Sequence, residues 1–179
     1  LQAWRQNHGS SWQLEPSVTS PYPEMLFGGR APAAVAPLTD AEWFDAGRAR
    51  VSEARPVLGV DVTHLVPREV IFLPLGWIGT TDKLSVSFAQ VFEGLPVEGA
   101  RMNVLFDAMG GLLSLHTTCA TGELEALAFE LDADTANLSV LTAFEVETGL
   151  NGRVTSAPRR AWWRTPLGGV RPAWITSVE

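Results

Sequence analysis

Apolar and polar positions alternate through the middle of the chain, over residues 84–117. Two sets of every-second positions lie on either side of a Gly-Leu-Pro turn: Val86, Phe88 and Gln90, then Met102, Val104 and Phe106. This period of two indicates strands with one buried face. A glycine turn at residues 107–111 leads to a third run, residues 112–117. The pattern predicts an antiparallel meander of three strands.

A helical period precedes the meander. Thr39 is a favourable N-cap, and Glu42 follows three residues later, which makes a capping box. One apolar stripe then recurs at helical spacing: Trp43, Gly47, Val51, Ala54 and Leu58. Pro56 is expected to end or kink this helix near Arg55. One helix followed by a meander predicts an α+β fold of the cystatin-like type, with the sheet curled around the helix.

The segments that flank this unit carry weaker signals. Residues 1–36 are rich in Pro and Gly, which leaves open either two short strands or a loosely ordered arm. Residues 62–66 predict a further helical turn, and the apolar run at 70–74 predicts a buried strand. Residues 76–82 are expected to form a loop.

The last third of the chain repeats the order of helix and strands. Residues 124–131 predict a strand or a short helix. Asp132 then offers an N-cap for a helix that Gly149 would terminate. Residues 160–164 and 171–178 predict a hairpin.

Composition and charge exclude several classes of protein. Of 179 residues, 46% are hydrophobic and 18% charged, which is enough to build a packed core. The net charge is −7 and the basic residues are scattered, which argues against a nucleic-acid-binding face. The longest apolar runs are too short for a membrane span, and no signal peptide is visible. Cys119 is the single cysteine, so no internal disulfide is expected.

Residues that carry chemistry are few. The His-Glu-x-x-His pattern of zinc peptidases is absent, and His8, His64 and His116 lie far apart in sequence. We therefore expect ordinary histidines, no metal and no cofactor. His116 lies three residues from Cys119, which on an extended chain places the two side chains on opposite faces. A shielded thiol is therefore expected in place of a nucleophile.

Two further groups have competing interpretations. Glu130, Asp132 and Asp134 could supply calcium ligands, but helix capping explains them without an ion and is favoured. Trp162 and Trp163 are adjacent in a predicted strand and must face opposite sides. The tryptophan that does not enter the core is either partly buried by the fold or serves as an anchor for a protein partner.

Residues 88–99 (FAQVFEGLPVEG), 104–107 (VLFD) and 110–115 (GGLLSL) resemble the FTP motif found in the propeptides of fungalysin- and thermolysin-type metallopeptidases. The predicted helix and hairpin at the C-terminal end, with the run Pro172-Ala173-Trp174-Ile175, are similar to the PepSY-like half of those propeptides. The resemblance implies an N-terminal arm at 1–36, an FTP-like subdomain at 37–118 and a PepSY-like subdomain at 119–179. It implies curled antiparallel sheets, each packed on a helix.

The resemblance also implies a function. The chain is expected to be the non-catalytic propeptide of a secreted zinc metallopeptidase, located outside the cell or in the cell envelope. It would act as an inhibitor and folding chaperone of the peptidase domain, its partner in cis or after cleavage. The expected contact residues on the outer sheet face are Phe92, Glu93, Pro96 and Trp163. A stand-alone exported interaction module without a peptidase and a small-ligand carrier stay open as alternatives.

Overall fold

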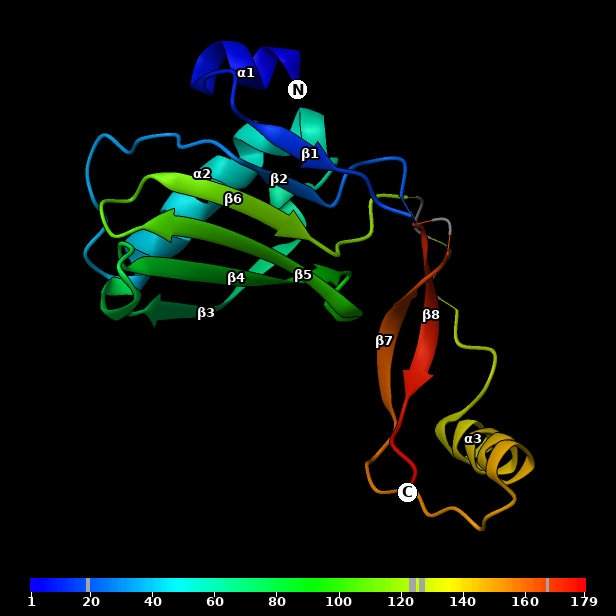
Figure 1. Ribbon diagram of the computed structural model, residues 1–179. Helices are drawn as coiled ribbons and strands as arrows, with labels where there is room; N and C mark the ends of the chain where they lie inside the picture. The colour runs from blue at the N-terminus through cyan, green and yellow to red at the C-terminus, as the bar shows by residue number, and fades with distance from the viewer. Residues whose placement is uncertain (19, 123–124, 126–127, 167) are drawn as a thin grey trace.

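The fold is a curled, half-barrel mixed sheet with three helices (Figure 1). We describe a computed structural model, in all its residues except 19, 123–124, 126–127 and 167. The strands are β1 (Gln13–Glu15), β2 (Met25–Phe27), β3 (Leu65–Leu73), β4 (Lys83–Phe92), β5 (Leu95–Asp107), β6 (Leu112–Thr117), β7 (Arg159–Arg164) and β8 (Val170–Ile175). The helices are α1 (Gln2–His8), α2 (Asp40–Leu58) and α3 (Ala133–Thr148), with 3-10 turns η1 (Val62–His64) and η2 (Gly76–Ile78). The α+β prediction is confirmed.

The order β1-β2-β6-β5-β4-β3 forms the main sheet, and β7 joins it by pairing with β5. The predicted meander is present as β4, β5 and β6, paired antiparallel throughout. Its two predicted apolar sets are buried as expected: Val86, Phe88, Gln90, Met102, Val104 and Phe106. The β4–β5 turn consists of Glu93 and Gly94, both at positive φ, which matches the twist of a tight hairpin.

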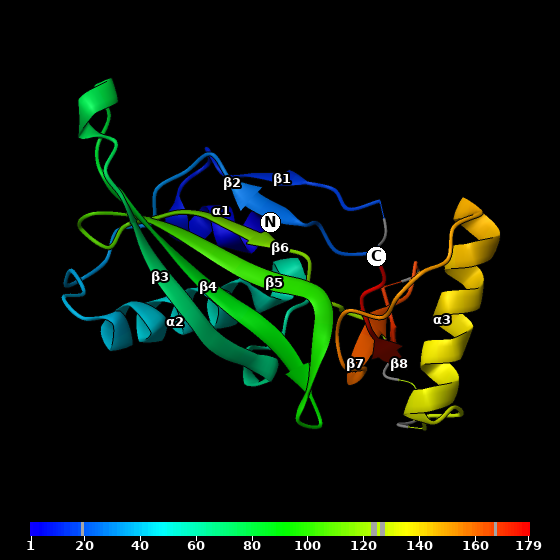
Figure 2. The same ribbon diagram turned by 90° about the horizontal axis from the view of Figure 1, so that it is seen from below.

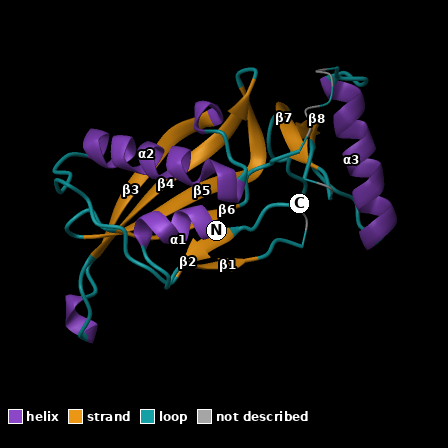
Figure 3. Ribbon diagram, turned by 90° about the horizontal axis from the view of Figure 1, so that it is seen from above, coloured by secondary structure: helices purple, strands orange, loops and turns teal. Residues whose placement is uncertain are grey.

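Helix α2 fills the concave side of the sheet (Figure 3). The capping box is confirmed, because the Glu42 N–H donates to Thr39 Oγ1 at 3.3 Å and the Thr39 N–H to Glu42 Oε2 at 3.0 Å. Of the two predicted effects of Pro56, an end or a kink near Arg55, the end does not occur there. The helix continues through Pro56 to Leu58. A proline this close to the C-terminal end removes only one internal hydrogen bond, so the helix tolerates it. Gly59, in the left-handed region, ends the helix.

The N-terminal residues belong to the sheet. Strands β1 and β2 pair with each other, and β2 pairs with β6, so the alternative of two short strands is confirmed. Trp12 is fully buried and Gly29 lies against its indole, where a Cβ atom would come within 2.3 Å of Trp12 Nε1. Helix α1 was not predicted, since its N-cap Leu1 offers no side-chain cap.

The strand predicted at 70–74 is present as the second half of β3, but the prediction that it is buried is wrong. Strand β3 begins earlier, at Leu65, and lies at the edge of the sheet, where it pairs with β4 alone. Its second half is consequently open to solvent, with Ile71 43% and Phe72 55% exposed. The predicted helical turn at 62–66 is present as the shorter 3-10 turn η1.

The C-terminal part is a hairpin with a helix beside it (Figures 1 and 2). Helix α3 and the β7–β8 hairpin are present as predicted, and Gly149 ends α3 in the left-handed region. In the segment predicted as strand or helix, residues 124, 126 and 127 lie outside the described residues, and the remainder has no regular structure. A single parallel pair, Val97 with Trp162, joins β7 to β5. None of the described helices is long and apolar enough to cross a membrane.

Candidate functional site

The predicted contact residues lie around the β4–β5 turn. Glu93 and Pro96 are exposed there, while Phe92 is half-buried and its ring packs edge-on against His64 at 4.5 Å between centroids. Strand β7 reaches the same turn, because Trp162 Nε1 donates to the Phe92 carbonyl at 2.9 Å. Trp163 is the next residue of β7, so its backbone lies close to the same turn.

The two adjacent tryptophans face opposite sides of β7, as the strand period requires. Trp162 is fully buried in a small core at the junction of the two parts: Val97, Ala100, Ala120, Trp162 and Val170. Trp163 points away from that core and is 47% exposed. It is thus a free aromatic surface next to the exposed turn.

The three histidines are separate in space as well as in sequence. His8 contacts Glu53 at 2.6 Å, His64 packs on Phe92, and His116 lies on β6 opposite Met25. Among the described residues, no group of three or more His, Cys, Asp or Glu side chains is placed to hold a metal ion.

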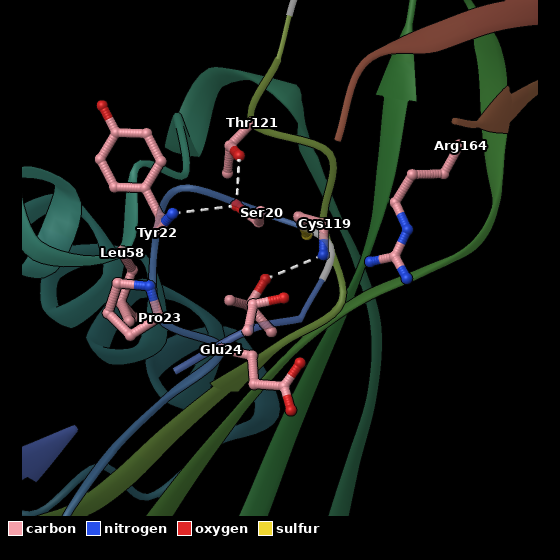
Figure 4. A pocket seen from close by; sticks show the side chains of 10 residues that line it. Ser20, Tyr22, Pro23, Glu24, Leu58, Cys119, Thr121 and Arg164 are labelled. Atoms are coloured by element: carbon pink, nitrogen blue, oxygen red, sulfur yellow. Dashed lines mark hydrogen bonds between the residues drawn. The ribbon is translucent and has the colours of Figure 1, made fainter. Parts of the chain in front are cut away.

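Cys119 lies at a small cavity of about 10 Å³ between β6 and the 17–24 segment, room for about one water molecule (Figure 4). Burial raises the pKa of its thiol to about 11, so the thiol is protonated near neutral pH. One hydrogen bond, between the Ser20 and Thr121 hydroxyls at 2.9 Å, joins the two walls of the cavity. A second, from the Cys119 N–H to Thr117 Oγ1, fixes the backbone within one wall. This arrangement stabilises the junction and leaves the sulfur without the properties of a nucleophile.

The acidic residues before α3 cap the helix. Asp132 Oδ1 accepts a hydrogen bond from the Thr135 N–H at 2.8 Å, and this bond lowers the pKa of Asp132. The capping interpretation is therefore confirmed for Asp132.

An apolar finger that the sequence reading missed is formed by the β3–β4 hairpin, residues 73–83. Figures 2 and 3 show it projecting beyond the rest of the sheet. At its tip Trp77 is 83% and Ile78 56% exposed, with Phe72 at its base. The sequence predicts only a loop here, because it does not reveal whether a tryptophan in a turn is covered.

The tip of the finger is held rigidly. Asp82 Oδ1 accepts hydrogen bonds from the N–H groups of Leu75 and Gly76, both at 2.9 Å. Lys83 Nζ donates to the Thr81 carbonyl at 3.0 Å, and η2 closes the turn itself. These bonds hold the backbone of the turn that carries Trp77, which reduces the backbone entropy lost when a partner binds it.

A second candidate surface lies between α3 and β8. A groove of about 570 Å³ separates them, with Phe129, Val140 and Trp174 among its apolar lining residues. The Arg160 guanidinium stacks on the rings of Phe129 and Trp174, at 4.9 and 5.3 Å. Pro172 lies in the middle of β8 and has no N–H, so this edge is a poor template for another strand.

No family model matches the chain, and no curated protein is significantly similar to it.

Proposed function

We propose that this chain is the non-catalytic propeptide region of a secreted zinc metallopeptidase of the fungalysin/thermolysin type, where it inhibits the peptidase domain and assists its folding. The proposal includes a cystatin-like, FTP-type first half and a PepSY-like second half. It rests on the resemblance of residues 88–115 to the FTP motif.

The observation that carries the proposal is the exposed apolar tip of the finger, at the end of β4 opposite the β4–β5 turn. The motif residues form the β4–β5–β6 meander that encloses α2, so most of them serve the core. The side chains left for a partner are the tip residues Trp77 and Ile78 and, at the β4–β5 turn, Glu93 and Pro96. Apolar groups held at fixed positions in water are typical of protein contact sites.

The mechanism is steric. A projecting finger with an indole at its tip fits a concave apolar site, and the active-site cleft of a peptidase is such a site. Insertion of Trp77 would exclude substrate until proteolysis removes the propeptide. The turn at Glu93 and the ring of Trp163 would then make a second contact on the peptidase surface.

The experiment uses the full chain and the peptidase encoded in the same reading frame or beside it. Hydrolysis of a fluorogenic peptide is measured with increasing amounts of the chain, and refolding of the denatured peptidase is measured with and without it. We expect inhibition at micromolar concentration and a higher yield of refolded peptidase. The substitution Trp77→Ala should weaken inhibition at least tenfold, because one buried indole contributes roughly 2 kcal/mol or more to an interface.

Val35→Ala is the matched control, since Val35 is 81% exposed and belongs to the loop before α2 and not to the finger. Equal inhibition by the wild type and by Trp77→Ala would reject the finger as the inhibitory element. No inhibition and no effect on refolding would reject the propeptide function, and a reading frame without a His-Glu-x-x-His domain would then favour the stand-alone interaction module.

The third alternative, a small-ligand carrier, requires a cavity on the concave side of the sheet. Helix α2 occupies that space, with Trp43 5.4 Å from Phe106 and Phe44 5.7 Å from Phe88 between ring centroids. The filled core therefore gives this alternative no support on the concave side of the sheet.

A further inference from the structure

Helix α3 has more apolar surface than the hairpin beside it covers. Of its sixteen residues, Ala136 alone is buried. On the side opposite the hairpin, Leu138, Thr142 and Val146 recur every four residues and form a stripe, which we call the outer face of α3. Leu138 is 65% and Val146 80% exposed. A helix that is apolar on two sides normally packs against two neighbours.

The hydroxyl groups of α3 add to this apolar character. Ser139, Thr142 and Thr148 each donate to the carbonyl four residues earlier, at 2.9, 2.9 and 2.7 Å. Their donors are therefore satisfied within the helix, and on the outer face the methyl group of Thr142 is left for a partner.

The charged residues of α3 itself, Asp134, Glu145 and Glu147, have one sign. The chain contains no Lys or Arg between Arg101 and Arg153. Seven acidic residues lie between positions 123 and 147, as many as the net negative charge of the whole chain: Glu123, Glu125, Glu130, Asp132, Asp134, Glu145 and Glu147. Asp134 and Glu145 flank the outer face within α3 itself.

The positions of two of these acids are unfavourable in the isolated helix. Glu145 and Glu147 lie in its last turn, where the helix dipole is negative and no basic side chain accompanies them. A positively charged partner would relieve this repulsion. A second copy of the chain would bring its own acids against them, so self-association through this face is opposed by like charge.

We propose that the outer face of α3 binds a basic amphipathic segment of another protein, with the partner's apolar side chains on Leu138 and Val146 and its Lys or Arg side chains on Asp134 and Glu145. This goes beyond the proposed inhibition, because it requires neither a peptidase nor the finger. An anionic lipid surface is the less favoured occupant, since it would be repelled by the same acids.

The test uses the full chain and synthetic peptides about 18 residues long, enough for five helical turns. A labelled helical peptide with a Leu stripe and flanking Lys residues is compared with the same peptide carrying Glu in place of Lys, and binding is followed by fluorescence anisotropy. The basic peptide should bind, and its affinity should fall severalfold when the salt concentration rises from about 50 to 300 mM. The acidic peptide should not bind.

The double variant Leu138→Ser/Val146→Ser should weaken binding of the basic peptide about tenfold or more, and Glu145→Gln about threefold. Val18→Ser/Val35→Ser and Asp45→Asn are the matched controls, because these residues are exposed outside α3 and should leave affinity unchanged. Circular dichroism establishes that each variant keeps its helices.

Any of the following outcomes would overturn the proposal: no binding of the basic peptide at low salt, equal binding by the wild type and the double variant, or a dimer in light scattering that the double variant abolishes. Binding to phosphatidylglycerol vesicles through the same residues would overturn it in favour of a membrane contact. Failure of the peptidase assay would leave these measurements untouched.

Discussion

Gln90 and Ala120 exchange two hydrogen bonds, one from Gln90 Nε2 to the Ala120 carbonyl at 2.9 Å and one from the Ala120 N–H to Gln90 Oε1 at 2.8 Å. The Gln90 side chain is fully buried and pairs with the backbone as a neighbouring strand would. This contact ties β4 to the segment that leaves the sheet for the C-terminal part.

The substitution Gln90→Leu should lower the free energy of unfolding by roughly 2–4 kcal/mol, because it leaves a buried N–H and a buried carbonyl without partners at about 1–3 kcal/mol each. Urea denaturation followed by tryptophan fluorescence measures this change. Gln13→Leu, on the exposed side of β1, is the control and should change stability by less than about 0.5 kcal/mol. Equal effects of the two substitutions would contradict the role of the paired hydrogen bonds.

Asp107 should make stability depend on pH. Burial raises the pKa of its carboxyl, but hydrogen bonds from Arg30 and from the N–H groups of Gly111 and Met109 outweigh burial and leave it lowered. A lowered pKa in the folded state contributes stability above the unfolded value of 3.8, and this contribution is lost as the pH falls through the folded value.

The substitution Asp107→Asn should therefore cost about 1–3 kcal/mol at pH 7 and much less near pH 3. Urea titrations of both proteins at the two pH values provide the measurement. Asp45→Asn should show the same stability as the wild type at both. A cost of Asp107→Asn that stays constant with pH would show that the carboxylate charge is not responsible.

Cys119 should resist modification in the folded protein. A rise of its pKa from 9.0 to about 11 lowers the thiolate fraction about a hundredfold near neutral pH, and burial restricts access further. Reaction with a coloured disulfide reagent should be complete within minutes in urea and at least a hundredfold slower in buffer. Equal rates in the two solvents would place the thiol at the surface.

Substitution of the two adjacent tryptophans should have very different effects on the stability of the fold. Trp162→Ala removes a fully buried ring and the hydrogen bond to the Phe92 carbonyl, so we expect a loss of about 3–5 kcal/mol. Trp163→Ala, one residue away, should change stability by less than about 1 kcal/mol, because the ring is half exposed. Thermal unfolding of both variants checks the contrast, and similar losses would mean that β7 is turned differently.

The sequence predicts an element well where its periodicity and its end signals indicate the same structure. The capping box of Thr39 and Glu42 predicts the start of α2. The alternation of apolar residues around Val86 and Val104 predicts the meander. A continuous apolar run such as residues 70–74 does not distinguish an edge strand from a central one, which is why it predicts a buried strand. Exposure at Phe72 depends on which strands lie beside it, and that is a property of the whole sheet.

The candidate surfaces were only partly accessible from sequence. Turn chemistry and strand period point to the β4–β5 turn and to Trp163, and the hydrogen bond from Trp162 Nε1 to the Phe92 carbonyl joins β7 to that turn. Trp77 was missed, because a tryptophan in a glycine-flanked loop carries no pattern that reports exposure. The outer face of α3 was missed for a related reason, since its helical spacing predicts an apolar stripe but not how many sides the fold covers.

The bare edge of β3 has a consequence for handling the protein. Pro67 and the bulge beside Arg68 prevent its first half from accepting another strand, but residues 69–73 are regular, rich in β-branched and aromatic side chains, and uncovered. Two molecules that meet along this edge can continue each other's sheet. Fibrillar aggregates of concentrated samples should therefore begin at Val70–Ile71–Phe72, and a single lysine at Ile71 should keep the protein in solution.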